Sequence, residues 1–380
     1  MKKPYTLYKR HTTKKNKYVY YIQFRNANGN RMTAVSSGQT SKTSAEAWAI
    51  KQLQEGMIKS TKDLKFSVFA QDWFVWGKCK YLERQLNRRE DYSRRHADDE
   101  RTLLKNHILP YFSNHRLSEI TVNQIENWLL SVKDRRSSST VNHALSTLKI
   151  MLGEAHRLGI INRNPVELVK RLRETPKKRN ILTIDEAQSL FHPESLISVW
   201  EGNLFHFTLN LIACVTGMRM GEIQALHRED FREDYLTISH SWDRKYGLKS
   251  PKNASERIVP LSHLATAKLR KLISMNGVTD SGGLIFYDET KHTPIYCKVI
   301  QKYFYQALTK IGITEKERKY RNITFHSWRH YFNSFMRYKV PDSKLQKVTG
   351  HRTMRMTEHY YHQQIEDLEE VREVQETMII

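Results

Sequence analysis

The pattern of hydrophobic and polar positions divides the chain into segments with different periods. Residues 17–25 are rich in aromatic and β-branched side chains, which is typical of a strand. The Asn-Gly step at Asn28–Gly29 predicts a hairpin turn, with a second strand over about 31–36. The segment 43–55 begins like a capped helix and ends before a glycine. A small sheet backed by one helix is therefore expected at this end of the chain.

Helical periodicity dominates residues 66–172. Aromatic residues three positions apart form one apolar face at its start, and Pro110 is expected to end one of the helices. Capping motifs at Thr121 and Ser137 predict two further helices, the second of which runs to about Leu158. This region is expected to be an all-α bundle.

A polar, basic stretch over 173–182 separates this bundle from the rest of the chain. A capping box at Thr183 then begins a mostly helical region, with two short strands predicted over 235–240 and 256–261. The fold class predicted from these patterns is multidomain α+β. Its three parts are a basic sheet with one helix over 1–60, a helical bundle over 65–175, and a mainly helical domain with a small sheet over 180–380.

Composition adds a strong positive charge to this picture. Lys and Arg total 63 against 40 Asp and Glu, which gives a formal net charge of +23 at pH 7. Residues 1–60 alone carry 12 basic side chains and two acidic ones. A polyanionic partner offsets the self-repulsion of such a chain, and nucleic acid is the expected one. On composition alone, a merely soluble basic protein remains the alternative.

Other classes of protein find little support in the sequence. The three cysteines have no paired spacing, so neither a disulfide framework nor a zinc site is indicated. No apolar run approaches the length of a membrane span, and the N-terminus lacks the apolar core of a signal peptide. The protein is expected to work in a reducing cytosol, without a membrane partner.

Six residues in the C-terminal half form a candidate catalytic set. Two arginines, a lysine and two histidines can stabilise the charge that develops on a phosphate, and a tyrosine can attack the phosphorus as a nucleophile. No metal or cofactor is needed for such chemistry. The six candidates are Arg219, Lys252, His326, Arg329, His351 and Tyr360.

Several of these residues have simpler interpretations when each is taken alone. Arg219 could be a surface arginine near a helix start, and Glu222 one turn on either orients a neighbouring catalytic group or is a helix-terminal charge. His326 and His330 have the spacing of a zinc pair. The zinc-protease motif, however, needs a glutamate after the first histidine, where Ser327 stands.

Two positions have a neighbour of the same type that competes for the role. Lys249 and Lys252 both lie near the expected turn between strands. Tyr360 and Tyr361 are adjacent, and adjacent helical positions point about 100° apart, so only one of them can face a phosphate.

The order and flanks of the six residues resemble the catalytic domain of tyrosine recombinases, the phage-integrase family. The resemblance rests on short motifs, with a nine-residue step from His351 to Tyr360 that selects Tyr360, and an eight-residue step from Lys252 to Pro260 that selects Lys252. The motifs are Thr216-Gly217-Met218-Arg219-Met220-Gly221-Glu222, Arg257-Ile258-Val259-Pro260-Leu261, His326-Ser327-Trp328-Arg329 and Thr349-Gly350-His351. Thr349 stands where the family more usually has leucine.

The resemblance implies a mechanism. Tyr360 attacks a scissile phosphate, which gives a 3′-phosphotyrosine and a free 5′-hydroxyl that later attacks the partner strand. Lys252 acts as general acid. The phosphorane is stabilised by the remaining four candidates, Arg219, Arg329, His326 and His351.

The resemblance also implies partners. These are double-stranded DNA at core and arm attachment sites, a homotetramer on that DNA, and room for a host DNA-bending protein and an excision factor. Residues 1–60 resemble the arm-site-binding domain of lambda-type integrases, which favours the integrase of a prophage or an integrative mobile element. The rivals are a chromosome-dimer-resolving recombinase, a type IB topoisomerase and a non-catalytic DNA-binding regulator. An apolar stripe from Ile365 to Met378 is expected to pack either on its own domain or on a neighbouring protomer.

Overall fold

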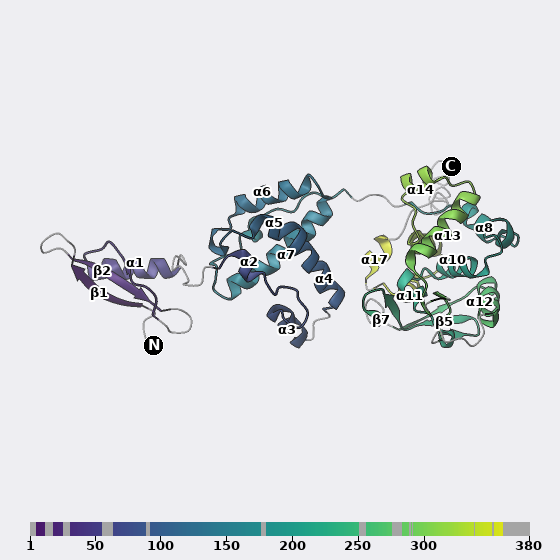
Figure 1. The fold of residues 1–380 in the computed structure, drawn as a ribbon, viewed down its shortest axis with the longest axis horizontal. Coiled ribbons are helices and arrows are strands. Elements are labelled where there is room, and N and C mark those ends of the chain that lie inside the picture. The colour runs from purple at the N-terminus through teal and green to yellow at the C-terminus, as the bar shows by residue number, and fades with distance from the viewer. Residues whose placement is uncertain are drawn as a thin grey trace, which may run out of the picture. The chain divides into compact units, whose positions relative to one another are not determined.

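Figure 1 shows the fold of the chain in a computed structural model. The chain divides into two compact units, residues 1–176 and 177–380. The structure describes residues 5–11, 18–25, 31–54, 64–88, 92–175, 180–250, 256–275, 283–288, 290, 292–337, 339–351 and 353–359.

The first unit begins with an antiparallel sheet of order β1-β2-β3, packed on one helix (Figure 1). Tyr5, Ile22, Phe24 and Ala49 form its small core. The elements are β1 (Tyr5–His11), β2 (Tyr18–Phe24), β3 (Val35–Ser36) and α1 (Lys42–Gln54).

The predicted strand 17–25 and helix 43–55 are confirmed. The strand predicted over 31–36 is shorter: Val35–Ser36 forms β3 beside β2, and Arg31 makes only an isolated bridge with Arg25. Strand β1 was not predicted. Its seven residues pair along the whole of β2, but no Asn-Gly or similar turn signal marks the connection between the two strands.

The rest of the first unit is the expected helical bundle. Its core contains Phe66, Leu104, Phe112, Trp128 and Leu148, all fully buried. The elements are α2 (Phe66–Phe69), α3 (Lys80–Asn87), α4 (Arg94–Leu103), the π-helical η1 (Leu104–Ile108), α5 (Leu109–Phe112), the 3₁₀ turn η2 (Leu117–Glu119), α6 (Val122–Lys133), α7 (Ser138–Arg157) and the 3₁₀ turn η3 (Pro165–Leu168).

The caps predicted for α6 and α7 are confirmed, because Thr121 and Ser137 each accept a hydrogen bond from the third residue of the helix that follows. The prediction that Pro110 ends a helix was wrong. Pro110 lies in the first turn of α5, directly after the π-helical turn η1. Helical structure runs without a break from α4 through η1 to Phe112, so the wider π-helical turn stands directly before Pro110 where a helix end was expected.

The second unit is mainly helical, with a three-stranded sheet of order β4-β5-β8 and two hairpins. Both predicted strands of this region are present as β5 and β8, and the predicted mixture of helices and small sheets is confirmed. The strands are β4 (Phe231–Arg232), β5 (Tyr235–Ile238), β6 (Ser241–Asp243), β7 (Gly247–Lys249), β8 (Arg257–Pro260), β9 (Tyr287–Asp288) and β10 (Thr293–Pro294). The helices are α8 (Ile184–Phe191), α9 (Ser195–Ser198), α10 (Leu204–Thr216), α11 (Met220–Gln224), the 3₁₀ turn η4 (Arg228–Asp230), α12 (His263–Met275), α13 (Cys297–Lys310), α14 (Glu315–Tyr320), α15 (Ser327–Met336), α16 (Asp342–Thr349) and α17 (Met354–His359).

Helix α10 is the centre of this unit. Eleven of its residues are buried, and it contacts α12, α13 and α15. A helix that is apolar on nearly all sides can only sit inside a domain, so its ends are fixed by the surrounding packing. In the part of the chain that the structure describes, no helix is both long and apolar enough to cross a membrane.

Candidate active site

Two helices of the second unit end in left-handed glycines, and each glycine is followed closely by a predicted site residue. Helix α10 ends at Gly217, with φ +60°, two residues before Arg219. Helix α16 ends at Gly350, with φ +65°, immediately before His351. Glycine adopts this conformation without the steric cost that a Cβ brings. At Gly217 a Cβ would also meet the Phe332 ring at 2.6 Å.

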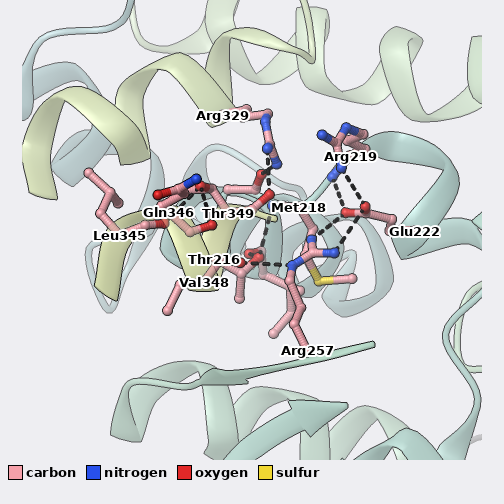
Figure 2. Close-up of polar contacts among 12 residues, drawn as sticks. Thr216, Met218, Arg219, Glu222, Arg257, Arg329, Leu345, Gln346, Val348 and Thr349 are labelled. Carbon is pink, nitrogen blue, oxygen red and sulfur yellow. Dashed lines mark hydrogen bonds and ion pairs between the residues drawn. The ribbon is translucent and has the colours of Figure 1, made fainter. Parts of the chain in front are cut away.

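Arg329 joins the two turns. It lies in the first turn of α15 and is completely buried. One terminal nitrogen, Nη1, donates to the carbonyl of Gly217 over 2.8 Å, and the other, Nη2, donates to the carbonyl of Thr349 (Figure 2). A guanidinium has five N–H donors, so bonds to the main chain are compatible with a further bond to a phosphate.

Glu222 holds Arg219 from the other side of its turn. Its carboxylate accepts a hydrogen bond from Arg219 Nη1 at 2.8 Å and another from the Arg219 main-chain N–H at 2.9 Å. It also accepts two bonds from Arg257, at 3.2 and 2.7 Å, and Figure 2 shows it between the two arginines. Burial opposes its ionisation, but Arg257 and Arg219 outweigh that effect and hold the pKa of Glu222 below its usual value. These contacts favour the interpretation in which Glu222 orients a neighbouring group.

Arg257 is the residue of this cluster that the sequence did not indicate. It begins β8, is 8% exposed, and donates from Nε to the carbonyl of Val348 in α16 over 2.8 Å. Along β8 it alternates with Ile258, which is 61% exposed. The hydrophobic pattern alone would predict that Ile258 is buried and Arg257 exposed, which is the reverse of what the structure shows.

His351 is buried among positive charges. Its Nδ1 lies 3.0 Å from Thr357 Oγ1 in α17, and its side chain is almost fully enclosed. Burial lowers the pKa of His351 to about 3, with further lowering by Arg329, Arg219 and Arg257. The imidazole is therefore neutral in the free protein at pH 7, and it lies within the electrostatic reach of all three guanidiniums.

His326 lies at the N-terminus of α15, three residues before Arg329. It is half-buried, and its ring meets the edge of the His330 ring at 5.4 Å between centroids. Among the described residues, no group of three or more His, Cys, Asp or Glu could hold a metal ion.

Lys252 and Tyr360 lie outside the described residues. Described residues close to them in the sequence are Lys249 and Thr357. The rival lysine, Lys249, donates to Asp243 Oδ2 at 3.0 Å across the β6–β7 hairpin. Helix α17 ends at His359, and its Thr357 is held twice, by the contact with His351 and by a bond from Asn333 Nδ2 to its carbonyl at 2.8 Å. After Arg257, Thr357 is the second residue near the site that the sequence motifs did not indicate.

The structure thus brings together three of the six predicted residues, Arg219, Arg329 and His351. With Arg257 and Glu222 they form a partly buried cluster that carries three guanidiniums and one carboxylate. In surroundings of low dielectric such a surplus of positive charge favours an anion.

Comparison with known proteins places this arrangement in a family. The phage integrase family matches residues 181–367, and the N-terminal SAM-like domain of phage integrases matches residues 90–132. The chain belongs to the phage integrase family.

Relatives of this integrase-family chain include integrases of phages and of a bacterium, and a bacterial tyrosine recombinase. It is 23% identical over 247 residues to the integrase of Escherichia phage HK022, which covers 64% of each chain. It is 25% identical to the ICEBs1 integrase of Bacillus subtilis strain 168, over 58% of each. It is 26% identical to the tyrosine recombinase XerC of Thermodesulfovibrio yellowstonii, over 62% of this chain and 75% of the relative. The chain thus spans less than two thirds of the length of the first two.

Solved structures of integrases share the fold. The Tn1549 transposon integrase in complex with transposon right-end DNA matches with a TM-score of 0.62 at 18% identity, over 76% of this chain and 96% of that one. The lambda integrase dimer bound to a COC′ core site matches with a TM-score of 0.55 at 19% identity, over 94% of both chains.

The low pKa of His351 generates a test of the cluster. The pKa of this histidine is 6.5 in the unfolded chain and about 3 in the folded protein, so between these values the unfolded chain binds a proton that the folded protein does not. This group therefore leaves stability unchanged above about pH 6.5, and costs up to about 1.4 kcal/mol per pH unit below it. We expect His351→Asn to flatten the decline in the free energy of unfolding between pH 6.5 and 5, measured by urea unfolding of the intact chain.

His206 supplies the matched control, because burial alone lowers its pKa to about 4 and it lies on α10. His206→Asn should flatten the decline between pH 6.5 and 5 to nearly the same extent, because both histidines stay unprotonated in the folded protein over that range. The two variants should differ only below about pH 4, where folded His206 takes up its proton and folded His351 does not. An unchanged slope in His351→Asn would show that burial and the neighbouring arginines do not depress the pKa of this imidazole in the folded protein.

Proposed function

We propose that this protein is a site-specific DNA recombinase, the integrase of a prophage or an integrative mobile element. The observation that carries the proposal is the convergence of Arg219, Arg329 and His351 at two glycine turns, in a chain of the phage integrase family. Relatives named integrase and tyrosine recombinase support the same activity. Such an enzyme is proposed to act in the cytoplasm, where its DNA lies.

The proposed reaction is a metal-free phosphoryl transfer. The Tyr360 oxygen attacks the scissile phosphorus, the bond to the 5′ oxygen breaks, and Lys252 gives that oxygen a proton. The resulting 3′-phosphotyrosine conserves the bond energy until a 5′-hydroxyl of the partner strand attacks it. Arg219, Arg329, His326 and His351 are proposed to stabilise the phosphorane. The salt bridge of Lys249 with Asp243 supports Lys252 over its rival as the acid.

Residues 1–60 are proposed to be a separate arm-site DNA-binding module, ahead of a core-site-binding bundle over 65–175 and a catalytic domain over 180–380. Side chains alternate between the faces of a strand, so Tyr8 and Tyr21 point away from the core that Ile22 forms with α1. On that outer face the two tyrosine rings stack at 6.1 Å, and Arg10 lies 5.1 Å from the Tyr21 ring centroid. Aromatic and cationic side chains together suit contact with nucleic acid.

The proposed assembly is a homotetramer on double-stranded DNA, with a host DNA-bending protein and an excision factor as further partners. A lambda integrase tetramer bound to a Holliday junction has the same fold, with a TM-score of 0.58 at 17% identity. An apolar groove of about 410 Å³ in the second unit could accept the stripe Ile365–Met378 of a second copy. The stripe itself lies outside the described residues. Val215, Phe332 and Val348 are among the residues that line the groove.

A chromosome-dimer-resolving recombinase is the closest rival, because XerC proteins are among the relatives. Sequence matches do not separate the two, because the XerC of Thermodesulfovibrio yellowstonii matches 62% of this chain and the integrase of Escherichia phage lambda 64%. The lambda integrase structure, however, matches 94% of this chain, a share that includes part of residues 1–60. The basic sheet module of residues 1–60 therefore favours an integrase.

The first prediction concerns the nucleophile. Tyr360→Phe should abolish covalent adducts on a nicked half-site DNA while leaving DNA binding intact, because only the attacking oxygen is lost. Tyr361→Phe is the matched control and should still form the adduct. Denaturing gels of protein trapped on labelled DNA measure both. Loss of the adduct in Tyr361→Phe alone would shift the nucleophile by one residue.

The second prediction concerns charge stabilisation. Arg219→Ala should slow half-site cleavage by about 10²–10³-fold, the typical effect of removing one preorganised donor. Cleavage by the wild type should persist in EDTA, since the arginines and histidines do the work of a metal. Single-turnover rates at saturating protein provide the measurement. Loss of activity on chelation, with recovery on Mg²⁺ or Zn²⁺, would contradict the metal-free mechanism.

The third prediction concerns the N-terminal module. Deletion of residues 1–60 should leave cleavage at a core site intact and impair integration between full attachment sites. A full-length variant with Tyr8→Ala and Arg10→Ala should show the same selective loss, because both side chains lie on the outer face of the sheet. Normal integration by the truncated protein would remove the arm-binding role.

A further inference from the structure

Arg257 lies at the start of strand β8, between helix α11 and the glycine turn after α16. Its two terminal nitrogens grip the Glu222 carboxylate at 3.2 and 2.7 Å, and the same carboxylate holds the Arg219 side chain and main chain. Its Nε donates to the carbonyl of Val348 at 2.8 Å, three residues before His351. The Arg257 guanidinium therefore contacts Glu222, which holds Arg219 at the start of α11. It also contacts the end of α16, directly before the turn that leads to His351.

The fit around Arg257 is close. A Cβ on Gly350 would lie 3.2–3.3 Å from Arg257 Nη1, Cδ and Cζ, so the guanidinium lies directly against the left-handed turn. The side chain of Arg257 is 6% exposed and that of Glu222 is fully buried. A planar fork that fills such a space fixes the distance between β8 and the turn more tightly than a flexible amine could.

We propose that Arg257 is a positioning residue of the recombinase, which sets Arg219 through Glu222 and sets His351 through Val348 and Gly350. This inference rests on the proposed function. Arg257 acts on the reaction through its neighbours, because Nε, Nη1 and Nη2 are each engaged in bonds to protein atoms. In the sequence, Arg257 stands five positions after Lys252.

The alternative is that Arg257 only stabilises the fold. A buried ion pair often adds little net stability, yet removing one partner leaves the other charge buried and is destabilising. Loss of stability alone therefore does not separate the two roles. A rate constant does, because it is measured on the molecules that are folded and bound.

The experiment is a double-mutant cycle on the intact chain. The variants are Arg257→Lys, Arg219→Ala, His351→Asn and Arg257→Lys combined with each of the other two, each tested for single-turnover cleavage of a nicked half-site at saturating protein. Arg257→Lys keeps the positive charge but loses the planar guanidinium that makes two bonds to Glu222. Displacement of a ligand by about 1 Å can cost about 100-fold in rate, so we expect Arg257→Lys to cleave about 10–100-fold more slowly, with near-normal affinity for DNA.

The cycle then shows whether the slower cleavage by Arg257→Lys depends on Arg219. If Arg257 acts through Arg219, Arg257→Lys should slow an Arg219→Ala protein by a clearly smaller factor than it slows the wild type. Arg270→Lys is the matched control, because Arg270 lies on α12 and bonds only the carbonyl of Glu233 among the contacts described, at 3.3 Å. It should cleave at the wild-type rate.

Two results would overturn the inference. One is a wild-type cleavage rate in Arg257→Lys. The other is an equal slowing by Arg257→Lys in the wild type, in Arg219→Ala and in His351→Asn, as expected for a contribution that is independent of both residues. Should Arg257→Lys not fold, Glu222→Gln replaces it in the same cycle, since it loosens the grip on Arg219 from the other partner. Failure of the proposed function would be distinct, because the wild type itself would then form no covalent adduct.

Discussion

One buried carboxylate makes the cationic cluster of this protein possible. Arg219 and Arg257 both donate to Glu222, which is completely enclosed. Like charges repel strongly where water is excluded, so two guanidiniums could not share this space without an anion between them. Because Glu222 satisfies both and also accepts the main-chain N–H of Arg219, it fixes the arginine side chain and the start of α11 together.

The same constraint explains why the site is suited to phosphate. Arg329 ties the two glycine turns, and His351 stays neutral because burial and the arginines depress its pKa. The cluster therefore retains surplus positive charge before any substrate arrives. Donors that are already in place need no reorganisation during the reaction, which is the general basis of electrostatic stabilisation of a transition state. The family assignment and this geometry lead to the same proposed chemistry.

Local signals in the sequence predicted much of the fold. The caps at Thr121, Ser137 and Thr183 each begin the helix that was expected there, since a cap is formed by residues within one turn. Pro110 was misjudged because a π-helical turn precedes it. Strand β1 was missed because it is recognised by its pairing with β2 and not by a hydrophobic pattern of its own.

The candidate site was also predictable only where a short motif in the sequence indicated the residue. Short motifs indicated Arg219, Arg329 and His351, and the structure brings these three together. Arg257 escaped because its partners lie 35 and 91 positions away, on α11 and α16, and because the exposed Ile258 beside it reverses the expected pattern. Contacts of this kind arise from tertiary packing and leave no local signal.

Arg219, Arg329 and His351 are proposed to form one phosphate site in which Tyr360 is the nucleophile. The decisive measurement is a crystal structure of the intact chain trapped covalently on a half-site DNA. We expect a phosphate bonded to the Tyr360 oxygen, its nonbridging oxygens within hydrogen-bonding distance of those three side chains, and Arg257 still bonded to Glu222. A phosphate carried by another residue, or one that contacts none of the three, would show that these residues do not form one catalytic site.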